Sequence, residues 1–186
     1  YNGGENEQWV GQVLESADNK RIVADEMMRH VDTLVEEHVE GMQEEKGEEH
    51  DHEEHGAKDP DHNASEKEEH DHETDEASDA AGEIDEHIWT SPVNAQKIVA
   101  QVAKDLAEVD QEHQEQYQKN ADKYIKKLQK LDKDIRQVTS GAKRKYLAFA
   151  DRFPLRYFVE EYGLDYTAAF AGCSSDTEPS AETITY

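Results

Sequence analysis

The chain contains several segments with a clear apolar periodicity and one long segment that has none. Apolar residues at helical spacing between Trp9 and Leu14 predict a first short helix. The same spacing recurs from Val31 to Met42 and predicts a second amphipathic helix. Between these two patterns, Lys20 to Ala24 is expected to form a short strand.

Two longer helices are predicted after the segment without periodicity. Ser91-Pro92 provides a helix start, because serine caps free amides and proline fits the first helical position. Apolar residues from Ile98 to Val109 then share one helix face. A further pattern covers residues 111–140 and ends at Gly141. This last helix would be roughly 40 Å long, which exceeds the length of most globular helices.

The last part of the chain has the order strand, helix, strand. Lys145 to Ala150 and Tyr166 to Phe170 are short apolar runs that predict buried strands. Leu155 to Tyr162 predicts a helix between them, closed by Gly163. This order is typical of a parallel α/β lobe, and a further helix is expected to open at Glu178-Pro179-Ser180.

The segment without periodicity is strongly acidic. Residues 43–86 hold 20 of the 45 Asp and Glu residues of the chain and three of its 20 Lys and Arg residues. Apart from one proline, residues 43–82 contain no apolar side chain larger than alanine. Such a segment cannot bury enough apolar surface to offset the entropy of ordering it, so a disordered loop is expected.

The formal net charge of −25 narrows the classes of partner. An acidic surface repels phosphate backbones and anionic lipid headgroups, so nucleic acid is not expected to bind. The single cysteine, Cys173, excludes an intramolecular disulfide and a multi-cysteine zinc site. No nucleophile elbow or phosphate-binding loop is present, so the sequence gives no support for an enzyme.

Histidines within the acidic loop are the clearest chemical signal. Imidazole nitrogens interleaved with carboxylates suit zinc, nickel or copper. A flexible loop would hold such ions in several weak, exchanging sites, which suits the collection of metal. The alternative is a solvated acidic loop whose histidines are incidental. The residues concerned are His50, His52, His55, His62, His70 and His72.

Two further residues are candidate metal ligands on their positions alone. His87 lies among acidic residues just before the capped helix, where a histidine can be a ligand or a structural residue. Asp151 follows a predicted parallel strand, at the end where open α/β sheets place ligands. It can equally be a helix cap or the ion-pair partner of Arg152. The residues themselves leave both questions open.

Several segments together resemble the metal-specific substrate-binding proteins of bacterial ABC importers, the zinc and manganese group. Their order along the chain is the order found in that family, and the resemblance covers nearly all of the chain outside the acidic loop. The matching segments are Tyr1-Asn2-Gly3-Gly4-Glu5 with Trp9, the histidine-rich loop, Glu86-His87-Ile88-Trp89-Thr90-Ser91-Pro92, Asp110 with Tyr117 and Asn120, Arg156-Tyr157-Phe158, Tyr162-Gly163-Leu164 and Glu178-Pro179-Ser180.

This resemblance implies two parallel-sheet α/β lobes joined by one long helix, with a metal ion held in the cleft between them. Residues 1–110 would then be the C-terminal part of the first lobe, with the acidic loop at 43–83. Residues 111–140 would be the linker helix, and residues 141–186 the start of the second lobe. Both lobes would be incomplete, so the resemblance implies that some ligands lie outside this chain.

The resemblance also implies roles for the two candidate ligands. It makes His87 a metal ligand. The family places a second ligand, His or Glu, five residues before the tyrosine that matches Tyr157, and Arg152 stands there in this chain. Arginine is a permanent cation and does not bind a metal ion. A one-residue insertion would bring Asp151 into that place instead.

The expected function is capture of a metal ion outside the cytoplasm and its delivery to an ABC-type importer, without catalysis. Zinc is expected before manganese, because manganese favours carboxylates and water over imidazole. The expected partners are the membrane permease of the importer and its ATPase, and the protein itself is expected to be a periplasmic or cell-surface lipoprotein and a monomer. A metal buffer acting through the loop alone, and an acidic interaction module, remain as alternatives.

Overall fold

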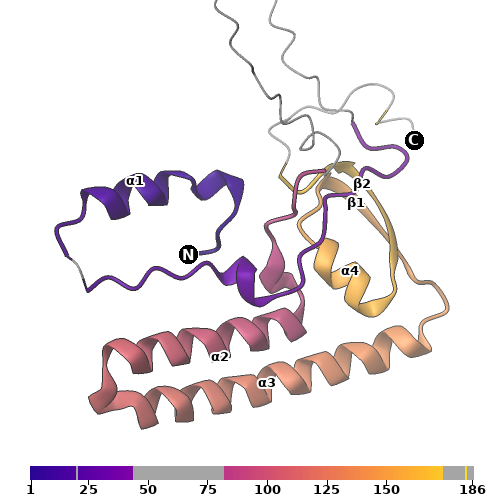
Figure 1. Ribbon diagram of the computed structural model, residues 1–186. Coiled ribbons are helices and arrows are strands. Elements are labelled where there is room, and N and C mark those ends of the chain that lie inside the picture. Colours follow the sequence, from indigo (N-terminus) through magenta and orange to yellow (C-terminus); the bar gives the residue numbers. More distant parts are fainter. Residues whose placement is uncertain (20, 44–81, 174–182, 184–186) are drawn as a thin grey trace, which may run out of the picture.

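The computed structural model describes residues 1–19, 21–43, 82–173 and 183 (Figure 1). In these parts the chain forms helices at the N-terminal side, a long helical pair, and a small sheet at the C-terminal side (Figure 1). The named elements are α1 (Trp9–Ser16), α2 (Pro92–Val109), α3 (Gln114–Gly141), β1 (Tyr146–Arg152), α4 (Arg156–Tyr162) and β2 (Asp165–Phe170), with 3-10 turns at Glu5–Glu7, Met27–His30, Ile88–Thr90 and Gln111–His113.

The predicted strand-helix-strand order is confirmed. β1 and β2 are parallel neighbours in a two-stranded sheet, with Tyr146 opposite Asp165 and Phe149 opposite Ala168. The register shifts between Phe149 and Arg152. α4 crosses from one strand to the other and ends at Gly163, whose φ of 59° lies in the left-handed region. Glycine occupies that region without steric cost, which explains the helix end.

The two predicted long helices are also confirmed. Ser91 caps α2, since its Oγ accepts hydrogen bonds from the amides of Val93 (3.2 Å) and Asn94 (3.3 Å). α3 has 28 residues and is therefore about 42 Å long. α2 and α3 pack side by side, and the far end of α3 reaches α4 (Figure 1).

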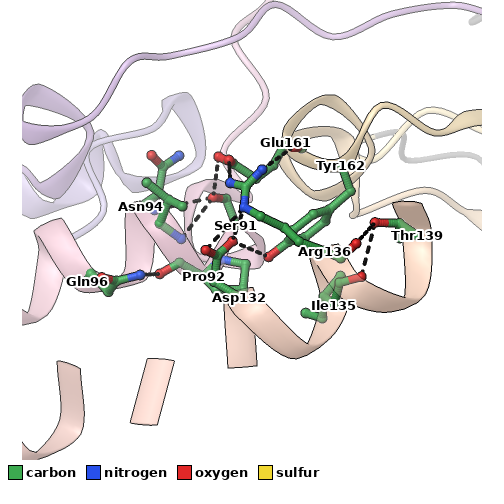
Figure 2. Close-up of polar contacts among 11 residues, drawn as sticks. Ser91, Pro92, Asn94, Gln96, Asp132, Ile135, Arg136, Thr139, Glu161 and Tyr162 are labelled. Atoms are coloured by element: carbon green, nitrogen blue, oxygen red, sulfur yellow. Dashed lines mark hydrogen bonds and ion pairs between the residues drawn. The ribbon is translucent and has the colours of Figure 1, made fainter. Parts of the chain in front are cut away.

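Polar side chains join α4 to both long helices, as Figure 2 shows. Arg136 of α3 pairs with Glu161 of α4 and with Asp132 one turn earlier in α3. Tyr162 donates a hydrogen bond of 3.1 Å to Asp132, and the Arg136 guanidinium lies 5.3 Å from the centre of the Tyr162 ring. Ser91 donates to Glu161 at 3.3 Å. These contacts hold α4 against α3 and against the start of α2.

The apolar core lies between the sheet and α4. Phe153 is 2% exposed and stacks on Tyr166, with ring centres 3.8 Å apart. Val159 and Ala168 complete the buried cluster. Val39 and Met42, from the chain before the acidic segment, pack against it. The core therefore combines residues that precede α2 and α3 in the sequence with residues that follow them.

The helix predicted from Val31 to Met42 is wrong: the 3-10 turn at Met27–His30 ends before this segment, and residues 31–43 then form no helix, only an isolated bridge at Val35 and a turn at residues 40–41. Its polar groups bond to distant segments. The Glu36 amide donates to the Glu83 carbonyl (2.7 Å), and Val35 pairs with Ile84 in an antiparallel bridge. Tertiary pairing has overridden a helical periodicity.

The strand predicted at Lys20 to Ala24 does not form in residues 21–24. Asn19 turns the chain instead, because its side chain accepts from the Arg21 amide at 3.0 Å and its carbonyl from the Ile22 amide at 3.3 Å. Among the described residues up to 110, no strand is formed beyond the isolated bridge, so the parallel sheet predicted for the first lobe is not seen there.

Two predictions fall outside the described residues. These are the disordered state of most of the acidic loop, with its six histidines, and the helix opening at Glu178. In the parts of the chain that are described, no helix is both long and apolar enough to cross a membrane.

Candidate metal centre

His87 lies at the start of the 3-10 turn Ile88–Thr90, directly before α2. The backbone amide and the hydroxyl of Thr90 both donate to the His87 carbonyl, at 3.1 and 2.8 Å. Ile88 is fully buried, so its side chain anchors the turn in the protein interior. The position of the imidazole is therefore set by a turn that is fixed both by hydrogen bonds and by packing.

Asp85 orients the His87 ring. The Asp85 carboxylate is 2% exposed, and its Oδ1 lies 3.2 Å from His87 Nδ1 and 2.8 Å from the His87 amide nitrogen. A carboxylate accepts hydrogen bonds, so in the neutral ring the proton resides on Nδ1. The Nε2 lone pair is then free. This arrangement of carboxylate, imidazole and open Nε2 is the one that protein zinc sites use.

The same contact changes the acidity of the imidazole. The hydrogen bond that His87 donates to Asp85 raises the pKa of His87 above its ordinary value of 6.5. Burial opposes the rise, and the charges of Asp85, Glu36 and Glu86 add to it. A protonated imidazole cannot bind a metal ion. Nε2 therefore becomes available as the pH rises through this raised pKa, and is lost as the pH falls through it.

The backbone on either side of Asp85 is held by three other segments. The Asp85 amide donates to the Leu34 carbonyl at 2.9 Å, and the Asp85 carbonyl accepts from the Tyr157 hydroxyl at 2.7 Å. The side-chain amide of Asn2 donates to the Glu86 carbonyl at 2.8 Å. Asn2 at the N-terminus, Leu34 and Tyr157 of α4 thus converge on the Asp85–His87 pair.

The chain after β2 approaches this pair closely. A Cβ atom added to Gly172 would lie 2.8 Å from the Phe153 carbonyl oxygen, 3.1 Å from Asp85 Oδ2 and 3.3 Å from His87 Cε1. The first of these distances is shorter than ordinary packing permits, so glycine is required at this point. His87 therefore lies between the turn before α2 and the chain segments that follow β1 and β2.

A small cavity lies beside the buried carboxylate. It has a volume of about 10 Å³, close to the size of one water molecule, and Asp85, Glu36 and Gly172 are among its lining residues. A second cavity of about 440 Å³ lies between residues 21–27 and α2. Neither His87 nor Asp151 is among the residues that line it. The small cavity adjoins the candidate site, and the larger one is separate.

Cys173 lies next to the candidate site. Its amide donates to Glu36 at 2.8 Å. Burial raises the pKa of the Cys173 thiol to about 12, and the carboxylates of Glu36 and Asp85 contribute to the rise. The thiol is therefore protonated at neutral pH, which makes it a poor nucleophile and a poor metal ligand in this state.

Of the other predicted ligands, only Asp151 lies in the described part of the chain, and it does not join His87 in a group of three or more metal-binding side chains there. Asp151 is exposed at the end of β1, and its Oδ1 accepts from the Arg152 amide at 2.8 Å. No group of three or more His, Cys, Asp or Glu side chains in residues 1–19, 21–43, 82–173 and 183 is placed to hold a metal ion. The six loop histidines lie outside those residues.

Three residues that shape the site were not assigned a role from the sequence. Asp85, Tyr157 and Gly172 contact His87 or its carboxylate partner. An aspartate two positions before a histidine is a usable signal, but acidic residues are too frequent here for it to stand out. Tyr157 and Gly172 are 70 or more residues away in sequence, and only the fold brings them close.

Comparison with known proteins identifies several relatives of this chain. High-affinity zinc uptake system protein ZnuA of Bacillus subtilis is 33% identical over 101 residues, which are 54% of this chain and 31% of that protein. A Zn(II)-bound variant of AdcAII from Streptococcus pneumoniae is 34% identical, with a TM-score of 0.51 over 59% of this chain and 40% of that one. A crystal structure of ZnuA is 26% identical, with the same TM-score and the same two coverages.

The chain thus spans 31% of the length of this curated relative and 40% of each of these solved chains. The family described as zinc-uptake complex component A, periplasmic, matches all of residues 1–186. This match confirms the resemblance predicted from the segments around His87 and Tyr157. The chain belongs to the family of periplasmic zinc-uptake complex component A proteins.

Proposed function

We propose that this chain binds zinc outside the cytoplasm, with His87 as one ligand, and delivers it to an ABC-type importer. The observation that carries the proposal is the Asp85–His87 hydrogen bond of 3.2 Å, which leaves Nε2 free for a metal ion. The names of the relatives support the choice of metal: one is a zinc uptake system protein, and another was crystallised with Zn(II).

Zinc suits this donor better than manganese does. A neutral imidazole nitrogen is a good ligand for zinc, whereas manganese favours carboxylates and water. Asp151 stays a proposed second ligand. The Arg152 amide bonds only to Oδ1 of this exposed carboxylate, so Oδ2 could bind a metal ion without breaking that hydrogen bond.

The acidic loop has a separate proposed role, which is to collect metal ions for the His87 site. Six histidines within residues 50–72 and the negative charge around them support a set of weak, exchanging sites. Zinc is the cargo in this scheme, and no bond in it is made or broken, so the protein acts as a carrier and not as an enzyme.

The family supports the proposed location and partners. Its description places such proteins in the periplasm, and the proposed partners are the permease and the ATPase of an importer. A monomer is part of the same proposal, with residues 1–110 as the C-terminal part of a first lobe, residues 111–140 as the linker helix and residues 141–186 as the start of a second lobe. Nucleic acid stays excluded from the proposal by the formal net charge of −25.

Deleting residues 43–82 from the full-length protein separates this proposal from a metal buffer that acts through the loop. If His87 belongs to a tight site and the loop only collects metal, the deletion leaves one tight zinc site and removes the weak ones. Isothermal titration with zinc, in the presence and absence of a competing chelator, measures both classes of site.

A matched control replaces the six loop histidines with asparagine and keeps the length and charge of the loop. The control is expected to behave like the deletion in zinc binding. If the deleted protein loses nearly all of its zinc binding, the loop is the functional unit and the buffer function replaces the carrier function.

A further inference from the structure

Tyr157 connects α4 to the segment that carries His87. The Tyr157 side chain is 3% exposed, and its hydroxyl makes two hydrogen bonds. It donates to the Asp85 carbonyl at 2.7 Å and accepts from the Leu34 amide at 3.1 Å. Leu34 and Asp85 lie on the two segments that pair at the Val35–Ile84 bridge, so one hydroxyl holds both segments at the level of the site.

Asp85 links Tyr157 to the imidazole of His87 by hydrogen bonds on both sides. The carbonyl that Tyr157 holds belongs to Asp85 itself, and the carboxylate of the same residue contacts both the amide and Nδ1 of His87. A rotation of the Asp85 peptide would move its carboxylate. That carboxylate favours the His87 tautomer with the proton on Nδ1. If Asp85 were displaced, the proton could move to Nε2, and the nitrogen that would bind the metal ion would then be blocked.

α4 is itself firmly placed, so Tyr157 can act as a fixed reference. At the other end of the helix, Glu161 and Tyr162 bond to Arg136 and Asp132 of α3 (Figure 2). Val159, which lies between Tyr157 and Glu161 in α4, is buried in the core. Through Tyr157, the position of α4 against α3 therefore fixes the position of the Asp85 backbone beside His87.

We propose that Tyr157 is a positioning residue for metal binding: its hydroxyl fixes the Asp85 carbonyl and thereby the carboxylate that orients His87. This inference rests on the proposed function of His87 as a zinc ligand. It assigns to Tyr157 no contact with the metal ion. The role depends on the hydroxyl alone, because phenylalanine would fill the same space without either hydrogen bond.

The test is Tyr157→Phe in the full-length protein with the loop of residues 43–82 removed, so that weak sites do not mask the tight one. Partners that orient a metal-binding histidine typically contribute 10- to 100-fold to affinity, so zinc is expected to bind about tenfold more weakly. In the zinc-free protein, ring ¹⁵N chemical shifts of His87 are expected to show a larger share of the tautomer protonated on Nε2.

Two buried tyrosines provide matched controls, each with one hydroxyl hydrogen bond to remove. Tyr162 lies on the same helix and bonds to Asp132 of α3 at 3.1 Å. Tyr166 lies in β2 and bonds at 3.4 Å to the carbonyl of Glu37, three residues after Leu34. Tyr162→Phe and Tyr166→Phe are expected to keep zinc affinity within about twofold and the His87 tautomer unchanged. Neither hydroxyl bonds to Asp85, and the Arg136–Glu161 ion pair still holds α4 against α3 in Tyr162→Phe.

The outcomes separate this inference from the proposed function. If Tyr157→Phe binds zinc like the parent while His87→Ala has lost the tight site, His87 is a ligand and the positioning role is overturned. If all three phenylalanine variants weaken zinc binding equally, general loosening explains the effect and the positioning role is again overturned. If His87→Ala binds zinc normally, the proposed function fails, and the tautomer measurement alone then decides whether Tyr157 positions Asp85.

Discussion

Replacing His87 with alanine is expected to remove the tight zinc site, with a loss in affinity on the order of 100-fold. Structural zinc sites bind with roughly 10–16 kcal/mol, so one ligand of four contributes about 3 kcal/mol, or roughly two factors of ten. The substitution takes away the one nitrogen that Asp85 holds open, and Asp85 is left buried beside a methyl group. Competition against a chelator of known zinc affinity measures the loss.

His113 supplies a matched control for this substitution. It too has Nδ1 bonded to an aspartate, Asp110, at 2.9 Å, but its side chain is 59% exposed and lies at the turn between α2 and α3. His113→Ala is expected to leave the tight site intact. Equal losses in the two variants would mean that zinc binds through scattered surface histidines, and the assignment of His87 would then be wrong.

Phe153→Ala is expected to be the most destabilising single substitution, lowering the free energy of unfolding by about 3–5 kcal/mol. The ring is 2% exposed, stacks on Tyr166 and meets Phe149 edge to face, so its removal leaves a cavity between the sheet and α4. The Phe153 carbonyl also faces Gly172 beside the site, so zinc affinity is expected to fall along with stability. Urea unfolding of the zinc-free full-length protein measures the change.

Val138→Ala serves as the comparison for that measurement. Val138 is 72% exposed on α3, so losing its two methyl groups is expected to change the free energy of unfolding by no more than about 0.5 kcal/mol. A Phe153→Ala variant as stable as Val138→Ala would show that the sheet and α4 do not share the core described above.

The part of the fold from Ser91 to Phe170 could be predicted because its signals are local. A capping serine before a proline, a glycine at a helix end and short apolar runs each act within a few residues. The segment from Val31 to Met42 was predicted wrongly for the opposite reason. Its amides and carbonyls bond to residues 83, 85, 157, 166 and 167, so distant partners decide its conformation.

The candidate site was predicted to a lesser extent. His87 could be singled out from the segment that surrounds it, and its partners could not. Asp85 is one acid among many in the sequence, and nothing in the residues themselves indicates that it is the buried one. Tyr157 and Gly172 approach the site through the packing of α4 and the turn after β2, which is a property of the whole fold.

Anomalous diffraction at the zinc edge, from crystals of the full-length protein with zinc bound, tests the central assignment most directly. We expect a zinc peak about 2.0–2.1 Å from His87 Nε2, with Nδ1 still bonded to Asp85. A fully occupied zinc ion elsewhere in the protein, with the His87 ring making no contact to it, would contradict the assignment.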